Sequence, residues 1–181
     1  MTATLPPIDA PGGLYREQAI DPCATALLSI DMQHAEWNPD FAARARRPDA
    51  PESRKRHLVD RIETLLIPNQ QRLQAAARAA RIEVVYTIIE SLTRDGRDRS
   101  LDHKISRIHH PPGSAEAAIL SAVGPAEDEI VIPKTASGVF NSTNIEYVLR
   151  NLGVRRLVVY GSYTDQCVVT AIRDAGDRGF R

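Results

Sequence analysis

Short apolar runs alternate along this sequence with stretches of helical periodicity, and this alternation limits the chain to few folds. Each run is almost continuously apolar, which is typical of parallel strands covered on both faces. Such strands are predicted at 25–30, 82–89, 129–132 and 156–160. Strand and helix in alternation predict a three-layer α/β fold with a mainly parallel sheet.

Helical patterns fill most of the segments between these strands. Leucine and isoleucine at helical spacing predict a helix over 52–66, and Pro68 is expected to begin a second one, where its missing N–H costs nothing. The residues expected to face inward from that second helix are Leu73, Ala76, Ala77 and Ala80. Further helices are predicted at 115–123, at 143–152 and from Thr164 onward, the last with Val168, Ala171, Ile172 and Ala175 inward. The long charged segment at 91–114 is expected to be a functional loop.

Composition excludes several classes of protein. The 181 residues carry 23 Lys+Arg and 23 Asp+Glu, so the chain lacks the basic excess that nucleic-acid binding needs. Two cysteines cannot form a disulfide framework, and we expect reduced thiols in a cytoplasmic protein. No signal peptide and no membrane span are expected, because the apolar runs are too short. Residues 1–23 are interpreted as an N-terminal arm and 24–181 as one domain.

Reactive side chains follow three of the predicted strands. Asp31, Lys134 and the segment 161–167 each come directly after a strand, and the carboxyl ends of parallel strands meet at one edge of the sheet. Cys167 near a helix N-terminus and a lysine is expected to have a lowered pKa, and Asp31 could move the proton. The alternative is a buried helix cysteine, a strand-end cap and a surface charge.

Three motifs favour the catalytic interpretation. Ser-Ile-Asp-Met-Gln at 29–33, Pro-Lys-Thr-Ala-Ser-Gly-Val-Phe-Asn-Ser-Thr at 133–143 and Gly-Ser-Tyr-Thr-Asp-Gln-Cys-Val at 161–168 resemble those of the isochorismatase-like cysteine hydrolases. The resemblance spans about 24 to 180 and implies a three-layer, Rossmann-like fold. It also implies a catalytic triad made of Asp31, Lys134 and Cys167.

The same resemblance implies a mechanism and a substrate class. An acyl-enzyme would form on Cys167, with a cis peptide between Ser162 and Tyr163 and an oxyanion hole from the N–H groups of Tyr163 and Cys167. Because the nucleophilic cysteine is present, we expect cleavage of a C–N bond in a small linear amide, ureide or carbamoyl compound. A nicotinamidase-like deamidase and a non-catalytic member of the fold remain alternatives.

No metal and no cofactor are predicted. His34, His57 and the pair at 109–110 lack the ligand spacing of a metal site, and zinc needs three protein ligands or more. Arg97 could clamp a substrate carboxylate, or belong to a solvated loop held by its own ion pairs. Glu90 could contact the ligand or orient a loop. The other candidate substrate-binding residues are Gln33, Trp37, Phe140 and Thr164.

The resemblance also bears on the end of the sequence. After Phe180 the family continues into another strand and further helices, so we expect the domain at 24–181 to lack the family's last strand and helices. The strand at 157–160 would then have an open edge, which favours aggregation or pairing with another copy. A homo-oligomer with weak activity is therefore expected.

Overall fold

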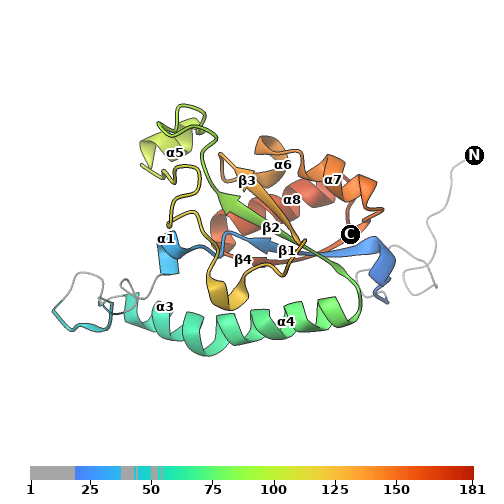
Figure 1. Cartoon of the computed structure of the whole chain (residues 1–181), viewed down its shortest axis with the longest axis horizontal. Coiled ribbons are helices and arrows are strands. Elements are labelled where there is room, and N and C mark those ends of the chain that lie inside the picture. Colours follow the sequence, from blue (N-terminus) through green and yellow to red (C-terminus); the bar gives the residue numbers. More distant parts are fainter. Residues whose placement is uncertain (1–18, 38–42, 44, 50–52, 54) are drawn as a thin grey trace, which may run out of the picture.

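Figure 1 shows a computed structural model of the chain, which describes residues 19–37, 43, 45–49, 53 and 55–181. Four parallel strands form one sheet at its centre, in the spatial order β3-β2-β1-β4. This sheet confirms the predicted α/β architecture. The strands are β1 (Thr25–Ile30), β2 (Glu83–Ile89), β3 (Ile130–Lys134) and β4 (Arg156–Gly161).

Helices cover both faces of this sheet and complete the predicted three layers (Figure 1). One layer is a long helical segment of α3 (Arg56–Arg61), the π-helical turn η3 (Ile62–Leu66) and α4 (Ile67–Ala79). The opposite layer contains α6 (Val139–Ser142), α7 (Ile145–Asn151), the π-helical turn η5 (Thr164–Val168) and α8 (Val169–Asp177). The shorter elements are η1 (Pro22–Ala24), α1 (His34–Trp37), α5 (Leu101–Ile105) and η4 (Ser121–Val123).

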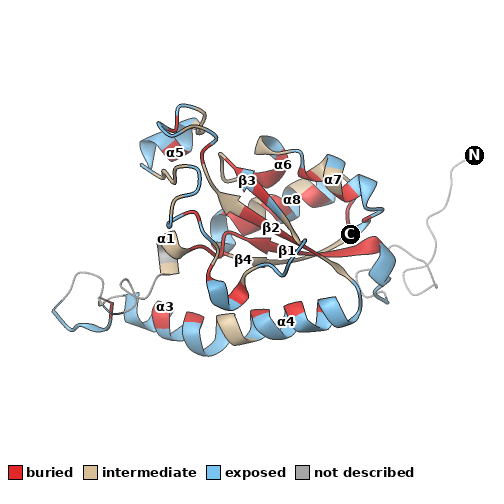
Figure 2. Ribbon diagram, in the orientation of Figure 1, coloured by how far each residue is buried: buried red, intermediate tan, exposed pale blue. Residues whose placement is uncertain are grey.

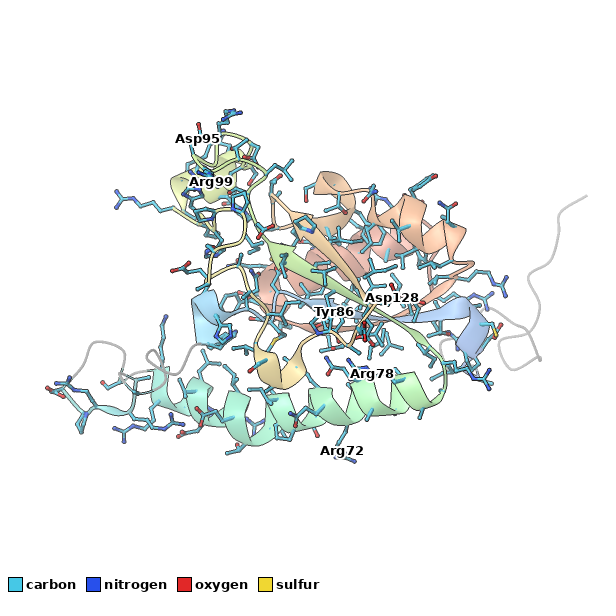
Figure 3. All side chains as sticks on the ribbon, viewed as in Figure 1. Arg72, Arg78, Tyr86, Asp95, Arg99 and Asp128 are labelled. Carbon is cyan, nitrogen blue, oxygen red and sulfur yellow. The ribbon has the colours of Figure 1, made fainter. Side chains whose placement is uncertain are left out.

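The two faces of the sheet are packed differently. Leu28 and Ile30 of β1 are fully buried in the apolar cluster beneath α6, α7 and α8, where Figure 2 shows most of the inward residues as buried. The α4 face is partly polar. Arg78 and the buried Tyr86 both lie on this face (Figure 3). Arg78 Nε forms a 2.8 Å ion pair with Glu129 Oε1, and the Tyr86 hydroxyl donates to Glu129 Oε2.

The predicted break between two helices at Pro68 is wrong. α3 and α4 form one continuous helical segment, because η3 joins them directly. Proline offers no N–H to the preceding turn of a helix. In η3 the N–H of Ile67 reaches back to the carbonyl of Ile62, and this wider turn accommodates Pro68 without ending the helix.

The buried face of α4 also differs from the prediction. Ala77 is buried as expected, whereas Leu73, Ala76 and Ala80 are exposed. Gln70 and Gln74 face the sheet instead, and Gln74 Nε2 donates to the hydroxyl of Tyr160 at 2.9 Å. The helix thus turns a polar face toward the sheet because the sheet presents a polar side chain there. The spacing of apolar residues alone does not reveal this orientation.

Two further helix predictions need correction. The stretch at 115–123 is no helix, apart from η4, because its backbone pairs with residues after β1: His34 N–H donates to Ala118 O and Leu120 N–H donates to Met32 O. The segment at 91–114 contains α5 and is not entirely loop. Ile172, expected inward on α8, is 51% exposed.

The outer edge of β4 carries the last described residue of the chain. Leu157 N–H donates to Arg181 O at 2.8 Å, and Arg181 N–H donates to Arg155 O at 2.9 Å, which is the pairing of a parallel strand. Leu157, Val159 and Ile172 line a shallow apolar groove beside this edge. Residues 1–18 of the expected N-terminal arm lie outside the described residues. Among the described helices, none has the length and apolar character needed to span a membrane.

Candidate active site

The carboxyl ends of β1 and β4 approach each other very closely. Gly161 has φ +136°, and a Cβ atom at that position would lie 2.1 Å from the carbonyl oxygen of Ile30, so only glycine fits. The next residue, Ser162, donates its N–H to Ile30 O at 3.0 Å. This contact holds the segment that leads to Cys167 against the end of β1, directly before Asp31.

Asp31 is 5% exposed and has φ +53°, a left-handed conformation that aspartate tolerates better than most residues. Its Oδ1 accepts a hydrogen bond from Thr87 Oγ1 of β2 at 3.0 Å. Its Oδ2 lies 2.8 Å from Lys134 Nζ at the end of β3. Three neighbouring strands thus fix both oxygens of this carboxylate.

Lys134 is fully buried, and its ammonium group has three partners. Besides Asp31, Nζ contacts Ala136 O at 3.0 Å and Cys167 Sγ at 3.4 Å. A buried ammonium group is tolerated only when it is paired and hydrogen-bonded, and here it forms an ion pair with Asp31 and two hydrogen bonds, to Ala136 O and Cys167 Sγ. The cation therefore links the carboxylate to the thiol.

Cys167 lies in the turn η5 and is 4% exposed. Burial and the charge of Asp31 raise the pKa of its thiol, Lys134 opposes both effects, and the net pKa is about 11. The predicted lowering of this pKa is therefore wrong. Nearness to a helix start and a lysine does not outweigh desolvation and an adjacent carboxylate. The resting thiol is protonated near neutral pH, with a base beside it.

The peptide bond between Ser162 and Tyr163 is cis. Ser162 is buried, and the ring of Tyr163 packs edge-on against Trp37 of α1, with 5.7 Å between ring centroids. Tyr163 and Ser162 both line the same cavity as Asp31 and Cys167. Trp37 supports the wall of this cavity from outside its lining.

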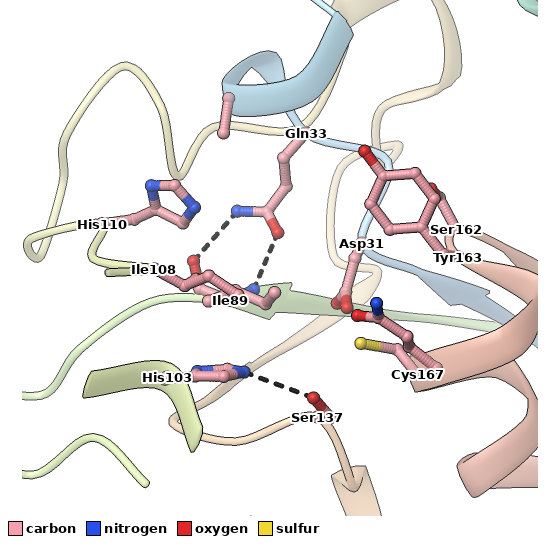
Figure 4. Close-up of a pocket in the computed structure, with 12 residues that line it drawn as sticks. Asp31, Gln33, Ile89, His103, Ile108, His110, Ser137, Ser162, Tyr163 and Cys167 are labelled. Carbon is pink, nitrogen blue, oxygen red and sulfur yellow. Dashed lines mark hydrogen bonds between the residues drawn. The ribbon is translucent and has the colours of Figure 1, made fainter. Parts of the chain in front are cut away.

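Gln33 lines this cavity, but its amide is occupied by the backbone. Oε1 accepts from Ile89 N–H at 2.8 Å, while Nε2 donates to Ile89 O at 3.0 Å and to Ala117 O at 2.8 Å. The side chain thus ties the end of β1 to the end of β2 (Figure 4). Glu90 is similarly occupied, because its Oε2 accepts the N–H of Gly113 and holds the loop after α5.

The remaining predicted pocket residues lie outside the lining of the cavity. Arg97 is exposed and pairs with Asp95, its neighbour in the loop after β2. Phe140 is buried against Phe180 in the apolar core. Thr164 is exposed at the start of η5.

Several lining residues were not among the predicted site residues. His103, His110 and Ser137 face the cavity, together with Ala35, Ile89, Ile108 and Gln166. His103 is fully buried on α5 and lies 3.4 Å from Ser137 Oγ through Nε2. Burial and the charge of Lys134 lower its pKa, so the imidazole is neutral near pH 7. Ser137 lies within the motif at 133–143, and this was the one sequence signal that could have identified it.

Groups of three or more metal-ligating side chains are not found among the described residues. The site consists of a thiol, a carboxylate and an ammonium group at the edge of a parallel sheet. This arrangement can carry out nucleophilic attack with proton transfer.

Comparison with known proteins places this site in a family. The model of the isochorismatase domain matches residues 25–181, which is most of the chain and includes Asp31, Lys134 and Cys167. The chain belongs to the isochorismatase family. A cysteine hydrolase from Pseudomonas syringae pv. phaseolicola has a similar fold, with a TM-score of 0.70 at 24% identity over 91% of this chain and 71% of the other.

Two relatives of this isochorismatase-family chain that are similar in sequence have named activities. An N-carbamoylsarcosine amidase of Arthrobacter is 35% identical over 64% of this chain and 46% of its own length. A ureidoacrylate amidohydrolase of Rhizobium rhizogenes is 29% identical over 60% of this chain and 51% of its own length. The chain thus spans about half the length of these relatives.

Proposed function

We propose that this protein is a cysteine hydrolase that cleaves a C–N bond of a small linear amide, ureide or carbamoyl compound. The observation that carries the proposal is the contact among the buried Asp31, Lys134 and Cys167, of which Asp31 and Cys167 line the cavity. Asp31 lies beside a thiol that is protonated at rest, so it is placed to accept the thiol proton.

In the first half of the reaction, the thiol proton moves to Asp31 while Cys167 Sγ attacks the carbonyl carbon. The oxygen of the tetrahedral intermediate accepts hydrogen bonds from the backbone N–H groups of Tyr163 and Cys167. Protonated Asp31 then gives its proton to the nitrogen of the leaving group. The C–N bond breaks, ammonia or an amine departs, and a thioester remains on Cys167.

In the second half, water enters the place that the amine has left. Asp31, again a carboxylate, accepts a proton from this water as its oxygen attacks the thioester carbon. The C–S bond then breaks, the acid product leaves, and the thiolate regains a proton from Asp31. Every proton taken by Asp31 is returned within one cycle, so no external base is needed.

Lys134 supports both halves without itself transferring a proton. Its ammonium group contacts Asp31 Oδ2 at 2.8 Å and Cys167 Sγ at 3.4 Å, so it stabilises whichever of the two is negative. Because the group is fully buried, water screens this attraction poorly. The lysine therefore lowers the free energy of the Cys167 thiolate that forms when the proton leaves sulfur.

The substrate class rests on the cavity and on the relatives. The cavity is small and open to solvent, so it has room for a small molecule and not for a polymer chain. Both named relatives act on compounds that contain a carbamoyl nitrogen, by their names a carbamoyl amino acid and a ureido acid. A nicotinamidase-like deamidase and a non-catalytic protein remain the alternatives that the experiment has to separate.

The cellular compartment and the oligomeric state are part of the same proposal. A nucleophilic thiol works in its reduced form, which favours the cytoplasm, and both cysteines are free.

We propose a homo-oligomer, because the exposed Ile172 and the half-buried Leu157 and Val159 form an apolar groove at the β4 edge. Light scattering coupled to gel filtration measures this directly. A monomer at micromolar concentration would contradict the oligomer.

The function is tested by release of ammonia or amine from a panel of simple amides, ureides, carbamoyl amino acids and nicotinamide. We expect turnover of at least one ureide or carbamoyl compound, with none in the Cys167→Ala variant. Preference for nicotinamide would favour the deamidase. Equal activity in the wild type and the Cys167→Ala variant would contradict catalysis by Cys167.

A further inference from the structure

Two polar side chains of the cavity, His103 and Ser137, take no part in the steps described above. They hydrogen-bond each other, with 3.4 Å between His103 Nε2 and Ser137 Oγ, and both line the cavity that Cys167 lines. Figure 4 shows this pair apart from Cys167, on another side of the cavity. It can therefore meet a part of the substrate other than the bond that breaks.

The pair is held firmly relative to the catalytic cluster. His103 is fully buried, and its backbone N–H donates to the hydroxyl of Ser100, the residue that caps the N-terminus of α5. Ser100 N–H in turn donates to Thr135 O at 2.9 Å, one residue after Lys134. Lys134 Nζ fixes the same loop through Ala136 O. Ser137 and the ammonium group thus belong to one hydrogen-bonded unit.

The protonation of His103 determines what Ser137 can offer. Its neutral imidazole carries a single N–H, and Nδ1 is buried without a hydrogen-bond partner among the described residues. A buried N–H without an acceptor is rarer than an acceptor without a donor, so the proton is assigned to Nε2. Nε2–H then donates to Ser137 Oγ. The hydroxyl proton of Ser137 is left to point into the cavity.

We propose that Ser137 is a recognition residue that donates a hydrogen bond to an acceptor oxygen of the substrate, and that His103 is the positioning residue that orients its hydroxyl. This inference rests on the proposed function and narrows it. The preferred substrate carries a second acceptor oxygen, a carboxylate or a second carbonyl, besides the carbonyl that Cys167 attacks. No arginine or lysine is among the described residues lining the cavity, so a neutral donor contributes this recognition.

The test compares two compounds that share a carbamoyl group and differ in one oxygen-bearing substituent, N-carbamoylglycine and N-ethylurea. Ammonia release gives kcat and KM for each. In the Ser137→Ala variant we expect KM for N-carbamoylglycine to rise about tenfold, with kcat within about threefold and KM for N-ethylurea within about twofold.

Variants of His103 separate positioning from a general structural role. His103→Leu should raise KM for N-carbamoylglycine as Ser137→Ala does, and His103→Gln should restore it to within about threefold, since its amide N–H can also donate. Lys104→Ala, an exposed change on the same helix α5, is the matched control and should leave both KM values unchanged. Equal losses for both compounds would show a structural role and overturn the inference.

Calorimetry separates this inference from the proposed function. Binding is measured in the Cys167→Ala protein with and without Ser137→Ala, so that no turnover is required. A dissociation constant for N-carbamoylglycine about tenfold weaker in the double variant supports recognition by Ser137 even if no compound is hydrolysed. Unchanged affinity, or binding of neither compound, overturns the inference.

Discussion

Asp31 follows β1, Lys134 ends β3, and both are almost fully buried, whereas Asp95 and Arg97 follow β2 and are exposed to solvent. Both groups are charged residues that follow or end strands at the same edge of the sheet, and Asp31, Lys134 and Arg97 were functional candidates in the sequence. The first pair joins residues far apart in the chain at 2.8 Å, and the second joins neighbours in one loop.

This difference shows which charges at a strand end carry chemistry. The Asp95–Arg97 pair is satisfied locally and screened by water, so it has little influence on its surroundings. The buried pair has neighbours from three strands and changes the pKa of Cys167. The following predictions test this contrast, beginning with the residue on which the buried pair acts.

Removing the nucleophile should have the largest effect. Cys167→Ala leaves no atom that can form the thioester, so turnover should fall by about 10⁴-fold or more, measured by ammonia release. Cys23→Ala is the control, because Cys23 is exposed and distant from the cavity lining. Its turnover should match the wild type. A comparable loss in both variants would mean that the cysteines do not differ in role.

Asp31→Asn should follow in magnitude. The amide keeps the shape of the side chain but cannot accept or return the proton, so turnover should fall by at least about 10²-fold. Asp165→Asn removes an exposed charge from η5 and serves as the control. Turnover in the Asp31→Asn variant close to that of the control would assign the proton transfer to another group.

Lys134→Met should reduce both activity and stability. The substitution leaves Asp31 buried without its cation, which costs about 3–5 kcal/mol of folding free energy, measured by denaturant unfolding. With the opposing charge removed, the pKa of the Cys167 thiol should rise, and alkylation should require a higher pH. An unchanged alkylation profile would show that Lys134 does not act on the thiol.

Arg97→Ala should have the smallest effect. The side chain is exposed and its ion pair is local, so kcat/KM should stay within about twofold of the wild type. The same should hold for Asp95→Ala. A rise of tenfold or more in KM would support the carboxylate clamp that the sequence suggested and remove the contrast drawn above.

The sequence predicted the sheet better than the details around it. Apolar runs such as that before Asp31 mark parallel strands, and polar residues directly after them mark the edge where a site forms. The inward face of α4 was mispredicted because Gln70 and Gln74 face a polar part of the sheet. That preference depends on the partner surface, which local periodicity does not contain.

The candidate site was predictable in its centre and not at its margins. Three motifs lead to Asp31, Lys134 and Cys167, but His103 lies in a segment without periodic pattern and reaches the cavity through tertiary packing. The sign of the pKa shift of Cys167 was also missed, because burial and the nearness of Asp31 are properties of the fold. Both failures concern desolvation and long-range contacts.

The central claim is that Cys167 rests as a thiol with Asp31 as its base, and the pH dependence of its alkylation tests this most directly. Iodoacetamide labelling, resolved by peptide mass spectrometry, should rise with pH toward a midpoint near the pKa of about 11, and be slower than labelling of exposed Cys23 near pH 7. In Asp31→Asn the midpoint should shift to lower pH, because the negative charge that raises the pKa is gone, while turnover is lost. A wild-type midpoint below about pH 8, or no shift in Asp31→Asn, would contradict the account.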